Sequence, residues 1–371
     1  MGVNQSFHDD ALVEAGRLMT ICNACRYCEG LCAVFPAMEM RRSFNRGDLN
    51  YLAHLCHQCG ACFPDCQYAP PHQFDVNVPA TLAKLRNAGY AAHAWPRAFA
   101  PAFARNGPAV ALAAALSLAA FVVAFVALQD PAVLFAGNAG DFYRLMPHAA
   151  MVGLFGLVSL YVIAAIAASL AGFWRDINTN GPRIGPLAVL RALHDAFTLR
   201  NLDGGRGGCT SENENPSAAR RLYHHLTFYG FLLCFASTSV ATLYHYAWGW
   251  RAPYPFFSLP VLLGTLGGIG LIVGPLGLLR LARRRAVQLT DPSHRGMDTA
   301  FAAMLVLVSL SGLLLMALRA TPAMGLLLAV HLGLVLGLFL TLPYGKFVHA
   351  LYRLLALVKY AAERRQGRFV A

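Results

Sequence analysis

Long apolar stretches dominate the chain after residue 107, and they predict helices that cross a membrane. Crossing a hydrocarbon core of about 30 Å takes about 20 helical residues. Six stretches reach that length, and each is bounded by Pro, Gly or charged residues. They cover residues 108–128, 147–174, 226–248, 256–279, 299–318 and 322–343. The pattern predicts a mainly α protein with a six-helix transmembrane bundle.

The region before the first apolar stretch has a different composition and is expected to fold as a separate domain. Residues 1–107 are rich in cysteine and end in a linker, residues 108–358 form the predicted membrane domain, and residues 359–371 form a basic tail. A polar connection at 175–222 interrupts the membrane domain. With 57% apolar and 13% charged residues, the chain is too apolar for an ordinary soluble protein.

The arginine residues predict how the chain lies in the membrane. The connections 174–221 and 280–296 and the tail each carry three or more arginines, whereas the opposite connections carry one each, Arg144, Arg251 and Arg319. Because positively charged connections are retained in the cytoplasm, both ends and the cysteine-rich domain are expected there, with the helices in the inner membrane. The net charge of +12 is therefore attributed to membrane orientation and not to nucleic-acid binding. The N-terminus has no signal-peptide pattern.

Eight of the ten cysteines form two runs with the same Cys-x-x-Cys-x-x-Cys-x-x-x-Cys spacing, from Cys22 to Cys32 and from Cys56 to Cys66. This spacing is typical of [4Fe–4S] clusters, in which the fourth cysteine of each run binds the other cluster. The predicted ligand sets are Cys22, Cys25, Cys28 and Cys66 for one cluster, and Cys56, Cys59, Cys62 and Cys32 for the other. Zinc sites and disulfides are the alternatives, and neither calls for two identical four-cysteine runs.

Histidines within or beside the apolar stretches are candidate haem ligands, because ionisable groups are costly inside a bilayer. His331 lies within the sixth stretch, and His349 follows 18 residues later, which is about 27 Å along a helix. His224 or His225 opens the third stretch and His245 closes it.

Two helices that each carry a histidine toward either face of the membrane would provide both axial ligands for each of two haems, as in a cytochrome b-like bundle. Because the third and sixth stretches run in opposite directions, similar depths in the membrane pair His225 or His224 with His349 on the cytoplasmic side. The same argument pairs His245 with His331 on the far side, where His148 competes as the partner of His245. One or two b-type haems are expected; the alternative is that the terminal histidines are simply interfacial.

Three segments carry a resemblance to known families. Residues 204–246, GGRGGCTSENENPSAARRLYHHLTFYGFLLCFASTSVATLYHY, and residues 291–315, DPSHRGMDTAFAAMLVLVSLSGLLL, resemble the tricarballylate-utilisation protein B family, also called CitB-like. That resemblance extends over nearly the whole chain. Residues 331–355, HLGLVLGLFLTLPYGKFVHALYRLL, are similar to the cytochrome b subunit of respiratory nitrate reductase and to heterodisulfide reductase subunits, which implies that His331 and His349 bind haem.

The family resemblance implies a membrane-bound electron-transfer subunit and not a stand-alone enzyme. Its partner would be a flavoprotein, the tricarballylate dehydrogenase, whose reduced flavin would pass electrons through two clusters and haem to a quinone in the bilayer. The alternatives are an anchor subunit of a different dehydrogenase or reductase, and a tricarboxylate transporter. The predicted spans contain almost no Asp or Glu, and a transporter would not need eight clustered thiolates, so the transporter is the weaker alternative.

Overall fold

The computed structural model describes residues 3–136, 140–179, 181–205, 207–210 and 215–367. Over these residues the regular elements are helices, and Cys209 and Ser217 form an isolated β-bridge. The mainly α fold predicted from the sequence is therefore confirmed. Residues 368–371 of the predicted tail lie outside the described residues.

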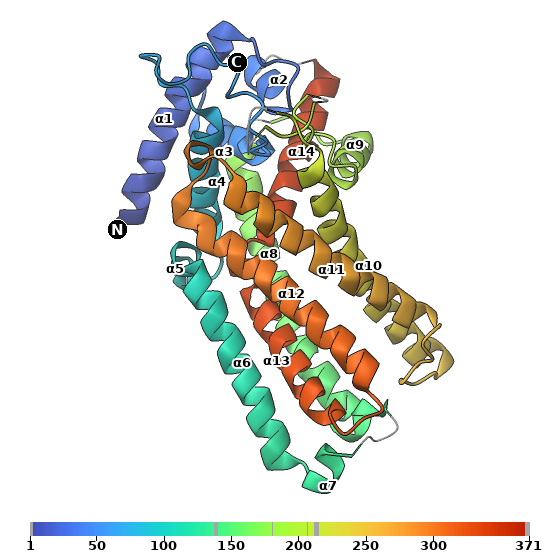
Figure 1. The fold of residues 1–371 in the computed structure, drawn as a ribbon. Helices are drawn as coiled ribbons and strands as arrows, with labels where there is room; N and C mark the ends of the chain where they lie inside the picture. Colours follow the sequence, from blue (N-terminus) through green and yellow to red (C-terminus); the bar gives the residue numbers. More distant parts are fainter. Residues whose placement is uncertain (1–2, 137–139, 180, 206, 211–214, 368–371) are drawn as a thin grey trace.

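The cysteine-rich domain consists of four helices, which Figure 1 shows gathered at one end of the molecule. They are α1 (Val3–Cys25), α2 (Val34–Glu39), α3 (Arg46–Leu55) and α4 (Val78–His93). Local sequence fixes where two of them begin. The side chain of Asn45 accepts a hydrogen bond from the backbone of Asp48, whose carboxylate accepts one from the backbone of Asn45, so α3 starts with a capping box. Asn77 caps α4 in a similar way.

In the described part of the chain, six helices are long and apolar enough to cross a membrane, as predicted. Their ranges are α6 (Asn106–Leu128), α8 (His148–Ile177), α10 (Ala219–Trp248), α11 (Leu259–Arg284), α12 (Arg295–Leu318) and a sixth made of α13 (Met324–Thr341) and α14 (Val348–Gln366). The short helices are α5 (Pro101–Ala104), α7 (Pro131–Leu134) and α9 (Pro186–Phe197), with single 3-10 turns at Arg97–Phe99, Phe142–Arg144, Val287–Leu289, Pro292–His294 and Leu342–Tyr344. Large apolar side chains such as Leu157 and Leu160 are mostly exposed, as expected for contact with lipid.

Two helix limits differ from the predicted ones in ways that affect the histidines and the tail. Helix α10 begins at Ala219 and not at residue 226, so His224 and His225 lie within its second turn. At the other end of the chain, residues 359–366 continue α14, and Lys359 and Glu363 are buried. This part of the predicted tail therefore contributes to the packed interior.

Helices α10 and α11 lie side by side along their length (Figure 1) and pack through glycine. A Cβ atom at Gly267 would lie 2.8 Å from the backbone oxygen of Gly230 and 2.7 Å from Sγ of Cys234. Only glycine allows the two backbones to approach this closely, as in other tightly packed membrane helices. This contact fixes the position of α10, which carries three of the candidate haem ligands.

Helix α14 leaves the membrane bundle and ends among the helices of the cysteine-rich domain (Figure 1), where buried ionic contacts hold it. Arg41 donates hydrogen bonds to the carboxylates of Asp48 and Glu363, both at 2.6 Å. The hydroxyl of Tyr51 also donates to Glu363, at 2.9 Å. Lys359 lies 3.6 Å from the same Glu363 carboxylate. The two domains are thereby joined through residues more than 300 positions apart in the sequence.

Candidate functional site

The eight clustered cysteines line two separate cavities. Three cysteines of the first run and the last of the second run form the outer set, Cys22, Cys25, Cys28 and Cys66. The remaining four form the inner set, Cys32, Cys56, Cys59 and Cys62. The grouping is the crosswise one predicted from the spacing of the two runs.

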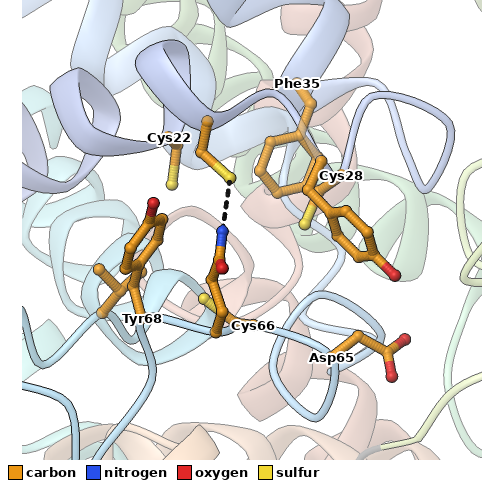
Figure 2. Close-up of a pocket in the computed structure, with 10 residues that line it drawn as sticks. Cys22, Cys28, Phe35, Asp65, Cys66 and Tyr68 are labelled. Atoms are coloured by element: carbon orange, nitrogen blue, oxygen red, sulfur yellow. Dashed lines mark hydrogen bonds between the residues drawn. The ribbon is translucent and has the colours of Figure 1, made fainter.

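The cavity of the outer set has a volume of about 240 Å³. In Figure 2 the sulfur atoms of Cys22, Cys28 and Cys66 face a common space, with Tyr68 and Asp65 at its margin. Among the described residues no group of three or more His, Cys, Asp or Glu side chains converges closely enough to hold a single metal ion. A cubane cluster instead keeps its four thiolates apart on separate iron atoms, and the side chains around this cavity suit such a group.

The inner set is more deeply buried than the outer set. Cys56 and Cys59 are each 8% exposed, whereas all four cysteines of the outer set are partly exposed. The loop that follows α9 covers this site: the backbone N–H of Thr210 donates to the carbonyl of Cys59 at 3.0 Å, and the side chain of Cys209 packs beside it. In its described part, this loop therefore shields the inner set from water.

The surroundings of both sets disfavour free thiolate. Burial, followed by the neighbouring cysteines, raises the pKa of Cys22 and of Cys28 to about 12. Burial likewise raises the pKa of Cys59 to about 11. Ligand binding to a metal centre requires the thiolate, so filling these sites would release protons.

Both cysteine runs make the same turn after their second cysteine. Arg26 and Gly60, which occupy equivalent positions in the two runs, have φ angles of 57° and 85°. This left-handed conformation is favourable for glycine and uncommon for arginine. The two runs therefore share a left-handed residue between their second and third cysteines.

Three arginines from three different helices donate hydrogen bonds to the loop between Cys56 and Gln58. Arg86 of α4 and Arg353 of α14 both donate to the carbonyl of Cys56, each at 2.9 Å. Arg220 of α10 donates to the carbonyl of Gln58 at 2.5 Å. The inner set is thereby attached to the two helices that carry the cytoplasmic-side histidine candidates.

Two of these candidates, His224 of α10 and His349 of α14, lie together, with ring centroids 6.0 Å apart. Nδ1 of His349 lies 2.5 Å from the carbonyl oxygen of Lys346, so Nε2 is left to bind a metal. An iron bound by two imidazole nitrogens, at bond lengths of about 2 Å, places ring centroids about 6 Å apart. The distance between the two rings is therefore compatible with the predicted binding of one haem iron by both histidines. The ring of His225 lies against Tyr229 instead.

On the far side, His245 lies beside His148 and not beside His331. The rings of His148 and His245 stack almost parallel at 9°, with centroids 4.1 Å apart, an arrangement that leaves no room for an iron between them. His331 lies against α12, where its Nδ1 is 3.0 Å from the hydroxyl of Ser311. The structure therefore does not bring His245 and His331 together, although their similar membrane depth suggests that pairing. The ligand assignment stays a prediction.

Comparison with known proteins also divides the chain into a cysteine-rich domain and a membrane part. Residues 101–369 match the family model described as citrate utilization protein B, and residues 15–92 match its Fer4-like domain. The chain is 51% identical over 356 residues to the citrate utilization protein B of Escherichia coli, covering 96% of this chain and 93% of that protein. The chain belongs to the citrate utilization protein B family. No solved structure matches it.

The Fer4-like domain of this family includes both cysteine runs and points to iron–sulfur binding. Sequence reasoning missed the arginines that join this domain to the membrane helices. A signal was available, because Arg220 precedes His224 by four residues and Arg353 follows His349 by four. Residues four apart lie on the same face of a helix.

Proposed function

We propose that the protein is an electron-transfer subunit of the inner membrane that reoxidises the reduced flavin of a partner dehydrogenase and delivers the electrons to quinone. The reduced flavin would give up two electrons and two protons, and the quinone would take up two of each to form quinol. Two [4Fe–4S] clusters and a b-type haem would supply the one-electron carriers that connect these reactions. The cysteine-rich domain and the C-terminus would lie in the cytoplasm, as the arginine distribution predicts.

One observation carries the proposal. His224 and His349 each lie one helical turn from an arginine that hydrogen-bonds the Cys56–Gln58 loop. Four residues correspond to a rise of about 6 Å, so the inner set and the imidazole pair are near neighbours. The outer set lines the more exposed cavity, and the inner set is bonded to the helices that carry the imidazole pair. This arrangement supports entry of electrons at the outer set and their transfer through the inner set toward the imidazole pair.

The substrate class comes from relatives and not from this chain's own side chains. The family name refers to citrate utilisation, and the resemblance noted in the sequence points to tricarballylate dehydrogenase as the flavin-containing partner. A tricarboxylic acid is thus the proposed substrate of the partner. The eight clustered cysteines and the imidazole pair support the proposal that this chain carries electrons.

The experiment that tests the proposal follows the partner's flavin. Anaerobically purified protein is mixed with tricarballylate-reduced dehydrogenase and a soluble quinone, and flavin absorbance is recorded. Reoxidation should be fast with the intact protein and slow with the Cys56→Ser or the His349→Ala variant. Iron and haem contents are measured on the same samples, with Cys209→Ser as the matched cysteine variant that should retain its iron. A colourless, iron-free protein, or equal reoxidation without it, would refute the proposal.

A further inference from the structure

The three arginines at the inner set bring positive charge to a site with little opposing charge. Arg86, Arg220 and Arg353 approach from α4, α10 and α14, and all direct guanidinium groups at backbone oxygens of residues 56–58. Gln58 receives an additional hydrogen bond, at 3.3 Å, from Nη2 of Arg86. Arg86 is only 5% exposed. These cations are therefore held in place and partly shielded from water.

No carboxylate of the described residues lies within 4.0 Å of any of these three guanidinium groups. The carboxylate of Asp298 on α12 interacts electrostatically with Arg86 at a greater distance, and it is bonded to Lys346 at 2.6 Å. A fourth cation, Arg285, is close enough that burial and then the charge of Arg220 lower its pKa to about 9. A buried excess of cations requires an anionic partner.

The outer set lies in different electrostatic surroundings. The carboxylate-bearing Asp65 lines its cavity. Of the arginines on its helix and turn, Arg17 is paired with Glu14 at 2.7 Å, and Arg26 is exposed and donates to the carbonyl of Asn23. Asp65 therefore lines the cavity of the outer set, whereas three arginines bond backbone oxygens beside the inner set.

A [4Fe–4S] cluster bound by four thiolates is anionic and becomes more so by one charge when it accepts an electron. Cations nearby stabilise the reduced form, and carboxylates destabilise it, so local charge shifts the reduction potential. We propose that Arg86, Arg220 and Arg353 raise the reduction potential of the cluster bound at the inner set above that of the cluster at the outer set. Electrons entering at the outer set would then be drawn toward the imidazole pair.

Burial acts in the opposite direction, because a dry site disfavours any gain of charge. The inner set is the more buried of the two, which by itself would lower its potential. The same burial strengthens the field of each guanidinium, however, and three of them act on one site. The effect of the arginines is therefore expected to exceed the effect of burial.

The inference rests on the proposed function, since it requires that both sets bind clusters. The test is a redox titration of the whole purified protein followed by electron paramagnetic resonance. A Cys25→Ser variant identifies the outer-set signal, because only that signal should change. The signal reduced first should be the inner one. Arg86→Gln should move its midpoint to lower potential, Arg86→Lys should restore it, and Arg26→Gln, the matched control at the outer set, should leave it in place.

Several outcomes would overturn the inference. The first is reduction of the outer cluster before the inner one. The second is an inner midpoint potential that Arg86→Gln leaves unchanged, or that Arg26→Gln shifts equally. The third is a shift of the haem midpoint potential alone, which would assign the arginines to the haem carboxylates. If Arg86→Gln loses its iron, the order of reduction in the unmodified protein decides. A purified protein without cluster signals would instead refute the proposed function, so the two failures are distinguishable.

Discussion

His224 of α10 and His349 of α14 face each other with ring centroids 6.0 Å apart, although 124 residues separate them along the chain. Two different contacts determine that distance. Glycine packing positions α10 against α11, and hydrogen bonds from Arg353 attach α14 to the Cys56–Gln58 loop. The imidazole pair is therefore held by the same framework that holds the inner cysteine set.

Replacing either member of this pair should remove the haem. In the His224→Ala and His349→Ala variants we expect haem per chain to fall to near zero, because an iron with one protein ligand is weakly held. His225→Ala is the matched control, since its ring lies against Tyr229 and should not affect haem content. Reduced-minus-oxidised absorption spectra give the measurement. Haem loss in His225→Ala together with retention in His224→Ala would reverse the assignment.

The far-side histidines should contribute less to haem binding. His331 is already hydrogen-bonded to Ser311, and His148 stacks on His245 without space for iron. We therefore expect one haem per chain, retained in the His331→Ala and His245→Ala variants. Haem and protein assays on the same sample test this. Two haems per chain, with one lost in His331→Ala, would show that these side chains rearrange when haem is present.

The crosswise grouping of the cysteines predicts which variants should behave alike. Cys66→Ser should alter the same paramagnetic signal as Cys25→Ser, although Cys66 belongs to the second run, because both side chains line the outer cavity. Cys32→Ser should alter the other signal, together with Cys56→Ser. Spectra of the four reduced variants provide the comparison. Grouping by run, with Cys66 affecting the same cluster as Cys56, would contradict it.

Much of this organisation follows from local sequence patterns. Apolar length identifies the six spans, and the repeated cysteine spacing predicts the crosswise grouping of the cysteines around two cavities. The pairing of helices does not follow in the same way. Depth in the membrane leaves His331 and His148 open as neighbours of His245, because depth does not say which helices are adjacent, and in the structure α8 places His148 there. The choice between His224 and His225 likewise depended on how α10 is rotated about its axis.

The glycine contact between α10 and α11 should be necessary for haem binding. In Gly267→Ala the new methyl group would meet backbone atoms at 2.8 Å, so α10 would have to move and His224 with it. We expect reduced haem content and a lower unfolding temperature. Gly153→Ala on α8 is the matched control, because no atom lies within 4 Å of a Cβ placed there. Equal haem content in the two variants would indicate that α10 does not depend on this contact.

Removal of the buried carboxylate at the end of α14 should be strongly destabilising. Glu363→Ala leaves Arg41 buried with one partner fewer, and breaking a buried ion pair costs about 3–5 kcal/mol. Glu14→Ala removes an exposed pair with Arg17, which is expected to cost about 1 kcal/mol or less. Thermal unfolding in detergent, followed by circular dichroism, compares them. Similar unfolding temperatures for both variants would contradict a stabilising role for Glu363.

The contact between Arg41 and Glu363 also affects how electrons could travel. Some redox proteins carry their clusters on a tethered domain that swings between donor and acceptor, and transfer then waits for each swing. Here the connection between α2 and α3 is bonded to α14, the last helix, so the cysteine-rich domain is fixed on the membrane helices. If the protein has the proposed function, the separation between its carriers would be constant, and each internal transfer would depend on a fixed distance. Only the encounter with the proposed partner and with quinone would then require diffusion.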